Sequence, residues 1–366
     1  MILNIFQRLL KNVGHRQIVI PLSAGNDSRL VASVLKHLGA KNVKCYSYGT
    51  QGNFETKISK TIAYKLGYEW TFVQLKHKKE KKFYKSNEYK KFLEFSETYF
   101  SIPYIQGLSS IKYLKENKWV DDDAIFINGN TGDFITGGHI NLKIKENRNI
   151  NSKEIRKENI LNQLIEKHYS LWGYLKTNYN INKIKNNLWK QITNINSELE
   201  DKKNDHLIYE YSEFVNRQAY VISGQRIYEY YGHDWRLPLW DNKYLAFWQK
   251  VPLDYKLKQK LFKDMLKENN FGNVWREDIP VNEKKINPKW LIPIRFVCKI
   301  PFVFFGKKGK KVWKQFDINF FKYWIDITST MKSHSYLKVM ISFFKEPRNS
   351  TSWEAEKYLT KFNFKK

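Results

Sequence analysis

A hexapeptide near the N-terminus, Ser23-Ala24-Gly25-Asn26-Asp27-Ser28, combines small residues with two hydroxyls and one carboxylate. Small side chains let backbone N–H groups approach phosphate oxygens closely, and a helix that starts near Asp27 would add its positive N-terminal dipole. The hexapeptide lacks the Gly-Lys-Ser/Thr of a Walker A loop and the G-x-G-x-x-G of a dinucleotide fingerprint. It predicts an anion site of another kind, and the alternative is an ordinary strand-to-helix turn capped by Asp27 or Ser28.

Two further segments carry groups that suit a polar site. Asn128-Gly129-Asn130-Thr131-Gly132-Asp133 is a second loop of small and polar residues, directly after the apolar run at 124–127. Asp234-Trp235-Arg236-Leu237-Pro238-Leu239-Trp240-Asp241 places charged residues around a proline farther along the chain. Each of the two small-residue loops offers a carboxylate, and oxygen ligands of this type suit Mg²⁺.

The elements around the first loop follow an alternating order. Apolar runs rich in β-branched and aromatic residues predict strands at 17–22, 43–48, 70–75 and 124–127. Helical apolar spacing predicts helices from residue 28 to 38 and from 55 to 66, with Gly39 and Gly67 as left-handed stops. Such alternation indicates an α/β protein with a doubly wound parallel sheet, in which ligands bind beyond the carboxyl ends of the strands.

The rest of the chain divides by composition. We predict a helical leader at 1–15, a main domain at 16–295 with a largely helical insertion at about 150–230, and a basic aromatic extension at 296–366. The two cysteines, Cys45 and Cys298, support neither a disulfide framework nor a zinc cluster, which fits a reducing cytoplasm.

A net charge of +28 fits a surface that meets a polyanion, an anionic substrate or a membrane. The alternative is a compositional bias, because Lys, Asn, Ile, Tyr and Phe are frequent in every part of the chain. No run approaches the ~18 apolar residues of a membrane span. We expect a cytoplasmic protein, and the mixed apolar and basic segment 295–314 would give it peripheral contact with the inner face of the membrane or else form a buried helix and a solvated loop.

The three motifs together resemble one known family. The first loop is similar to the S-G-G-x-D-S pyrophosphate loop (PP-loop) of the ATP pyrophosphatase superfamily, with Ala24 for the first glycine. Residues 126–139 resemble V-L-S-G-E-G-A-D-E-L-F-G-G-Y of asparagine synthetases, sharing Gly129, Asp133, Gly137 and Gly138, and residues 234–241 resemble E-x-R-x-P-F-L-D. From residue 16 to 289 the chain is therefore similar to the asparagine synthetase-like family, in its synthetase domain without a glutaminase domain.

This resemblance implies an adenine nucleotide alpha hydrolase-like fold and an AMP-forming, ATP-dependent ligase that activates a carboxylate as an acyl-adenylate. It implies Mg²⁺ held by Asp27 and Asp133, and a catalytic lysine at Lys284 or Lys285, of which Lys285 is preferred for its spacing to Pro288. The residues implied to bind ATP and pyrophosphate are Leu22, Ser23, Ala24, Gly25, Asn26, Asp27, Ser28, Tyr48, Asn128 and Gly129.

One position departs from the family where the second substrate would bind. Asn130 stands where asparagine-forming relatives carry glutamate, and an amide cannot act as a general base. The acceptor half of the reaction is therefore expected to differ, with Asn130 as a candidate catalytic residue. With Ile2 in place of the N-terminal cysteine nucleophile, ammonia would come from solution or from a separate glutaminase subunit, or another amine would serve.

By analogy the expected substrate is a hexuronic acid carboxylate of surface polysaccharide biosynthesis, carried as a nucleotide-sugar or lipid-linked sugar. The alternatives are an asparagine synthetase acting on aspartate, a tRNA-modifying PP-loop enzyme, and a degenerate nucleotide-binding scaffold. The second-loop match and the lack of a catalytic cysteine pair argue against the tRNA-modifying enzyme, so a nucleic acid partner is not expected.

Overall fold

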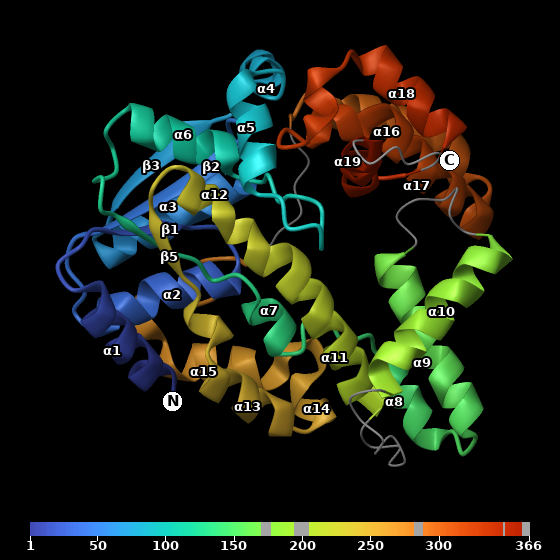
Figure 1. Cartoon of the computed structure of the whole chain (residues 1–366), viewed down its shortest axis with the longest axis horizontal. Helices are drawn as coiled ribbons and strands as arrows, with labels where there is room; N and C mark the ends of the chain where they lie inside the picture. The colour runs from blue at the N-terminus through green and yellow to red at the C-terminus, as the bar shows by residue number, and fades with distance from the viewer. Residues whose placement is uncertain (170–176, 194–204, 282–287, 347, 361–366) are drawn as a thin grey trace.

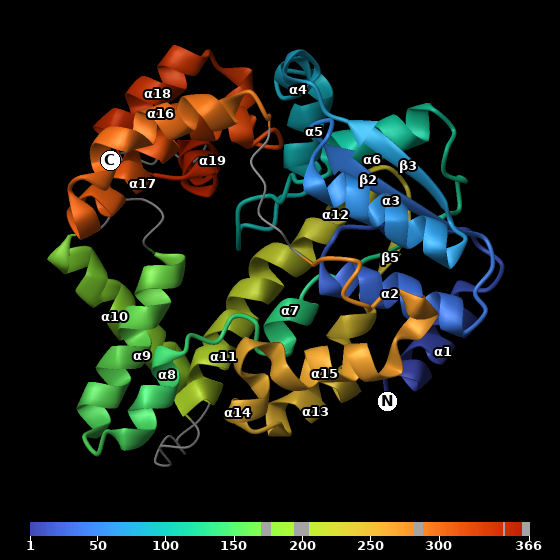
Figure 2. The ribbon, with the colours of Figure 1, turned by 180° about the vertical axis from the view of Figure 1, so that it is seen from behind.

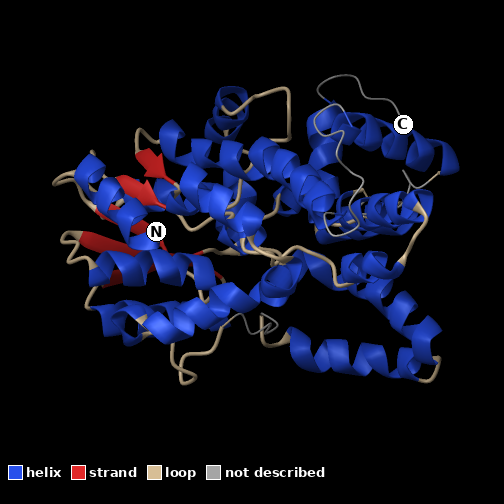
Figure 3. Cartoon of the chain, turned by 90° about the horizontal axis from the view of Figure 1, so that it is seen from below, coloured by secondary structure: helices blue, strands red, loops and turns tan. Residues whose placement is uncertain are grey.

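The computed structural model describes residues 1–169, 177–193, 205–281, 288–346 and 348–360 of the 366. Five parallel strands form one sheet in the order β3-β2-β1-β4-β5, and Figure 3 shows them gathered at one end of a largely helical molecule. The strands are β1 (Ile18–Pro21), β2 (Val43–Gly49), β3 (Glu69–Gln74), β4 (Ile125–Ile127) and β5 (Asp234–Arg236). The predicted doubly wound α/β fold is confirmed.

The strand order reverses between β1 and β4, which lie side by side although about a hundred residues separate them. Ile18 pairs with Ile125 and Val19 with Phe126, so the loops that follow the two strands leave the same edge of the sheet. Such a switch point leaves a crevice between the two loops, which is where open parallel sheets bind ligands.

Helices cover both faces of the sheet, because the strands are apolar on both sides (Figure 1). Ile18 and Ile20 point into one core and Val19 into the other, as the two-residue period of a strand requires. The first core is covered by α1 (Ile2–Val13), α2 (Asn26–His37), α3 (Phe54–Leu66), α13 (Asn242–Lys250) and α15 (Lys260–Asn269). The second is covered by α4 (His77–Phe83), α5 (Asn87–Phe95), α6 (Leu108–Glu116) and α12 (Arg226–Tyr230).

The remaining helices form two groups beyond the sheet. One has its own small core, built from residues between 140 and 209 and from Leu253. It comprises α8 (Lys143–Glu146), α9 (Lys153–His168), α10 (Asn178–Thr193), α11 (Asp205–Arg217) and α14 (Leu253–Lys256), whereas the short α7 (Gly132–Ile135) packs into the first core. The other is the C-terminal bundle of α16 (Leu291–Val303), α17 (Gly306–Ile325), α18 (Tyr336–Lys345) and α19 (Ser350–Leu359).

The C-terminal bundle lies at the opposite end of the molecule from α1, as Figures 1 and 2 show from front and back. The predicted boundary at residue 295 falls inside α16, and the apolar face of α1 packs into the first core. Within the described residues, no helix combines the length and the apolar character needed to cross a bilayer.

Candidate nucleotide and carboxylate site

The first loop runs from the end of β1 into α2 and is closed by its own hydroxyls. Ser28 Oγ accepts a hydrogen bond of 3.0 Å from the Ser23 backbone N–H, and the Gly25 N–H donates to Ser23 Oγ at 3.1 Å. Gly25 is the N-cap of α2, so neither Asp27 nor Ser28 has the capping position that an ordinary turn would give it. Asp27 lies in the first helical turn, where the helix dipole favours negative charge on a side chain or on a ligand.

The second loop packs against the first with no space for larger residues. A Cβ on Gly129 would lie 2.6 Å from the carbonyl carbon of Asp27 and 2.7 Å from the Ser28 nitrogen. A Cβ on Gly132 would lie 2.7 Å from Asp27 Cγ. The contacts at Gly129 are with backbone atoms and lie far inside van der Waals distance, so glycine is required there for the two loops to meet, whereas an added Cβ at Gly132 would meet only the side chains of Asp27 and Leu239.

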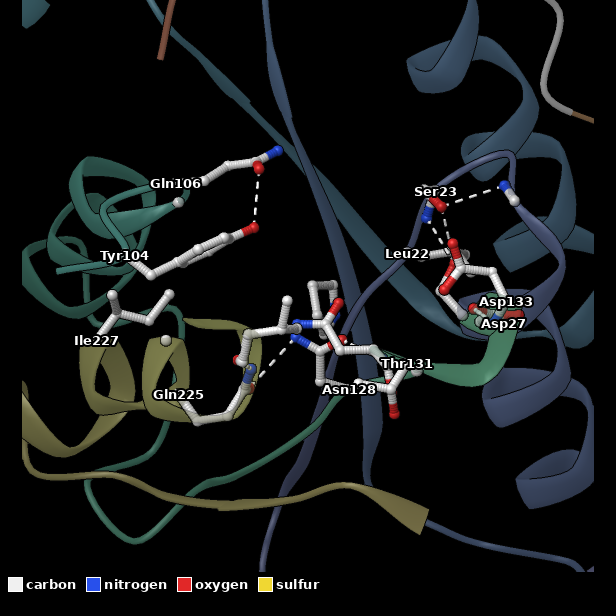
Figure 4. Close-up of a pocket in the computed structure, with 18 of the residues that line it drawn as sticks. Leu22, Ser23, Asp27, Tyr104, Gln106, Asn128, Thr131, Asp133, Gln225 and Ile227 are labelled. Atoms are coloured by element: carbon white, nitrogen blue, oxygen red, sulfur yellow. Dashed lines mark hydrogen bonds between the residues drawn. The ribbon is translucent and has the colours of Figure 1, made fainter. Parts of the chain in front are cut away.

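A direct hydrogen bond joins the two loops at their carboxylates. The Asp133 backbone N–H donates to Asp27 Oδ2 at 2.7 Å, and Figure 4 shows the two side chains beside each other next to Ser23. Residues 106 positions apart are thereby brought to one point, as their places after β1 and β4 predicted.

Thr131 holds the second loop in an uncommon backbone conformation. Its φ is +76°, in the left-handed region that a β-branched residue adopts only at a cost of about 1–2 kcal/mol. The asparagine synthetase motif has glycine at this position, so the strain belongs to this chain. Strain that persists at such a point is a common feature of functional loops.

A buried carboxylate orients Asp133 through a histidine. His139 Nε2 lies 2.9 Å from Asp133 Oδ2, and its Nδ1 lies 2.7 Å from Glu213 Oε2 on α11. Burial alone would raise the pKa of Glu213, but hydrogen bonds from His139 and His168 and the charge of Lys167 outweigh it and hold that pKa well below its ordinary value. Glu213 therefore stays ionised and fixes the ring that contacts Asp133.

Arg29 links the first loop to a distant segment of the chain. Its guanidinium is buried and donates to the carbonyls of Ala24, Val274, Ile279 and Pro280 at 2.9–3.2 Å. Burial lowers its pKa to about 10, so it remains charged at neutral pH. Residues 274–280 are thereby held beside the loop.

Lys284 and Lys285 lie outside the described residues, in the span 282–287. The last residue that Arg29 contacts is Pro280, two residues before that span begins. The assignment of a catalytic lysine therefore stays a prediction.

The two loops form one end of a pocket with a volume of about 560 Å³. We call this the two-loop end (residues 22–28 and 128–133). The opposite end, here the tyrosine end, is lined by Tyr48, Tyr104, Tyr220 and Tyr228 together with the amides of Gln106 and Gln225. Figure 4 shows Tyr104, Gln106 and Gln225 on the far side of Asn128 from Asp27 and Asp133.

The tyrosine end is built by close packing and by neutral hydrogen bonds. Gly224 permits the approach of Tyr104, whose Cγ would lie 2.7 Å from an added Cβ. Asn128 Nδ2 donates to the Tyr228 hydroxyl at 3.2 Å, and burial raises the pKa of Tyr228 to about 12. Tyr220 projects from a π-helical turn, Gln218–Ile222, and such turns are frequent at functional sites.

Most of the predicted binding residues meet in this pocket. Its lining includes Leu22, Ser23, Gly25, Asn26, Asp27, Ser28, Tyr48, Asn128, Gly129, Asn130 and Asp133. Ala24 is not part of the lining, since it is fully buried and its carbonyl accepts from Arg29. Sequence reasoning missed Glu55 and, apart from Tyr48, the tyrosine end, because these residues belong to no motif. It also gave no role to Thr131, although this residue lies in the second loop.

The charge of the lining restricts how an anion could bind. Among the described residues, the lining contains the carboxylates of Asp27, Glu55 and Asp133 and no lysine or arginine. Burial raises the pKa of Glu55. A polyphosphate would meet negative charge here unless a cation accompanied it.

Asp27 and Asp133 suit Mg²⁺ bound together with phosphate. Mg²⁺ sites at phosphates commonly use one or two carboxylates and complete the shell with water and phosphate oxygens. The described residues contain no cluster of three or more His, Cys, Asp or Glu side chains able to hold a metal alone. The pocket that both carboxylates line has a volume of about 560 Å³, which leaves room for a ligand beside them.

Comparison with known proteins identifies the family of this chain. The asparagine synthase family model matches residues 11–270, which include both loops, β5 and the helices that enclose the pocket. A search of curated proteins found no match. The match spans most of the chain and all five strands, and the chain belongs to the asparagine synthase family of ATP-dependent amidating ligases.

Proposed function

We propose that this protein activates a carboxylate with ATP, forming an acyl-adenylate and pyrophosphate, and then transfers the acyl group to ammonia or an amine. The observation that carries the proposal is the hydrogen bond from the Asp133 N–H to Asp27 Oδ2, which unites both loops in one pocket at the switch point of the sheet. In the first step a carboxylate oxygen attacks the α-phosphorus and the bond to the β-phosphate oxygen breaks. In the second the amine attacks the acyl carbon, AMP leaves and the nitrogen loses a proton.

The two-loop end would hold the phosphates. Residues at the start of α2 line the pocket, and the N-terminus of a helix together with small loop side chains suits phosphate oxygens. Asp27 and Asp133 would hold Mg²⁺, which when bound supplies the positive charge that pyrophosphate requires as it leaves. Glu213 and His139 would keep the Asp133 carboxylate in the orientation this task needs.

A lysine would complete the charge balance. Lys285, or its neighbour Lys284, follows the segment that Arg29 holds at Ile279 and Pro280. We propose that this lysine acts at the α-phosphate, where negative charge develops. Arg29 would then be a positioning residue, acting through the backbone that carries the lysine.

The tyrosine end and Asn130 favour a ring-shaped, hydroxyl-rich substrate without an ammonium group, and we propose a hexuronic acid unit of surface polysaccharide synthesis. Tyrosine rings stack on sugar rings, and the amides of Gln106 and Gln225 offer both donors and acceptors for hydroxyl groups. Aspartate is less suited, because Asn130 lacks the carboxylate that would pair with its ammonium group. The amide nitrogen would come from free ammonia or from a separate glutaminase subunit.

The test is exchange of labelled pyrophosphate into ATP with the purified protein, Mg²⁺ and a panel of carboxylates: free hexuronates, nucleotide-linked hexuronates and aspartate. We expect exchange that needs both Mg²⁺ and a uronate. Exchange with aspartate alone would refute the proposed sugar substrate but support carboxylate activation by ATP. Absence of exchange with every carboxylate, together with no ATP binding, would refute the proposed function.

A further inference from the structure

The first helix of the C-terminal bundle, α16, is an apolar helix that remains largely uncovered. Of its thirteen residues only Leu291 is buried. Phe296 is 69% exposed, Val297 and Val303 are each 63% exposed, and Phe304, just after the helix, is 82% exposed. Apolar surface of this extent, contributed by one element, marks an interaction site. A buried helix, the alternative that the sequence left open here, is wrong.

One side of α16 is already in use, and it is a different side. Arg295 forms a bidentate ion pair with Asp317 of α17 at 2.6 and 2.7 Å. Phe302 packs on Trp313 and Phe316 of the same helix, with ring centroids 5.6 and 5.3 Å apart. Residues 295 and 302 lie two turns apart on this packed side, so α16 is fixed in orientation and presents Phe296, Ile300 and Phe304 outward.

A dense positive cluster adjoins the exposed stripe. The turn after α16 leads directly into α17, whose first nine residues include five lysines. Lys299, Lys307, Lys308, Lys310, Lys311 and Lys314 are all exposed, and segment 295–314 contains no acidic residue. We call this combination the α16–α17 corner: the exposed residues Phe296, Val297, Ile300, Val303 and Phe304 and these six lysines.

We propose that the α16–α17 corner docks on an anionic lipid surface. The apolar stripe would enter the boundary between headgroups and acyl chains, while the lysine stems extend to the phosphates around it. At 13 residues α16 is about 20 Å long, shorter than the ~30 Å core of a bilayer, so it would lie along the surface and not across it.

Charge complementarity selects this occupant over the other candidates. A second copy of the chain that met the corner through a two-fold axis would bring twelve unpaired lysines together, which is unfavourable. Nucleic acid would match the lysines but not the aliphatic side chains of Val297, Ile300 and Val303, since base recognition uses stacking on planar groups. An anionic bilayer matches both the charge and the apolar stripe.

Vesicle flotation with the full-length protein tests the proposal. The vesicles are of phosphatidylcholine alone or of about two parts phosphatidylcholine to one part phosphatidylglycerol. We expect binding to the anionic vesicles only, and weaker binding when NaCl rises from about 0.05 to about 0.5 M. Absence of binding to anionic vesicles, or equal binding to neutral ones, would overturn the proposal.

Two variant pairs test the corner, and the first distinguishes binding through its lysines from binding through the net positive charge of the protein. Lys307, Lys308, Lys310 and Lys311 changed together to Gln should reduce the partition coefficient by at least about tenfold. The control changes Lys78, Lys79, Lys81 and Lys82 of α4 to Gln, which removes the same charge from exposed positions elsewhere, and should alter partitioning less than about twofold. Equal loss in both would mean that binding follows net charge, and the corner would be excluded.

The second pair tests insertion of the apolar stripe. Phe304→Gln should lower partitioning about tenfold, whereas Tyr64→Gln on α3, where the ring is 85% exposed, should leave it unchanged. Circular dichroism melting checks that all four variants fold. If Phe304→Gln bound vesicles normally, the apolar stripe would not contribute to binding and the proposal would fail. If the wild type were a dimer and Phe304→Gln a monomer, the corner would bind a second copy of the chain and not a lipid surface.

Discussion

The two ends of the pocket are built in different ways. At the two-loop end the backbone makes the site: Gly129 lies against the backbone of residues 27 and 28, and the Asp133 N–H bonds to Asp27. At the tyrosine end long side chains from α12, the π-helical turn and the segment near residue 105 converge on open volume. Backbone packing tolerates few substitutions, whereas side chains can be exchanged one at a time. Activation chemistry would thus be retained while the substrate changes.

The largest expected effect is at the two carboxylates. Asp27→Asn and Asp133→Asn each remove a charge that would hold Mg²⁺, and each should reduce pyrophosphate exchange by about a thousandfold or more, about 4 kcal/mol in the transition state. The measurement is exchange rate at saturating ATP, with thermal unfolding as the folding control. A folded variant with nearly normal exchange would remove the two-aspartate metal site.

A pair of glycines compares the two ends directly. Gly129→Ala forces a Cβ against backbone atoms at 2.6 and 2.7 Å, which cannot move without displacing α2, and should cost about a hundredfold in exchange. Gly224→Ala meets the Tyr104 ring instead, which can shift with its side chain, and should cost about tenfold or less, mainly in the KM for the carboxylate. Equal losses would show that both ends are equally rigid.

A smaller effect is expected at the junction of the two ends. Tyr228→Phe keeps the ring stacked on Phe126, 4.5 Å away, but removes the hydroxyl that accepts from Asn128. The Asn128 amide would then keep only its long hydrogen bond of 3.5 Å to Gln225, so the KM for ATP should rise about threefold to tenfold and the free energy of unfolding should fall by about 1 kcal/mol. Steady-state kinetics and urea unfolding measure the two quantities. An unchanged KM for ATP would show that the orientation of Asn128 does not affect nucleotide binding.

The smallest effect on activation is expected from Asn130→Glu. This change restores the acidic residue of asparagine-forming relatives at the pocket wall. Pyrophosphate exchange should change less than about threefold, while the KM for ammonia should fall, because a carboxylate can hold ammonium beside the acyl carbon. Both rates are measured on the same preparation. A collapse of exchange would instead assign Asn130 to activation.

The sequence predicted the sheet and the two-loop end well, and physical reasons explain this. The strand predicted at 43–48 is Val43–Gly49, and Gly67 has the left-handed φ of +68° that its place after a helix indicated. Loops between a strand and a helix are local, so a short motif specifies them.

The tyrosine end, apart from Tyr48, could not be predicted in the same way. Tyr104, Tyr220 and Tyr228 come from separate elements, and only the packing of α6, α12 and the sheet brings them together. Strand β5 is three residues long and holds its place through pairing with β4, so no apolar run indicates it. The exposure of α16 depends on how α17 packs against it, and this packing cannot be read from amino-acid composition.

Activation of the carboxylate as an acyl-adenylate transfers one carboxylate oxygen to AMP, and this transfer can be measured directly. A uronate labelled with ¹⁸O in its carboxyl group is incubated with ATP, Mg²⁺, ammonia and the protein, and the products are analysed by mass spectrometry. We expect one ¹⁸O in the phosphate of AMP and one in the amide. Label in inorganic phosphate with formation of ADP, or AMP without label, would contradict it.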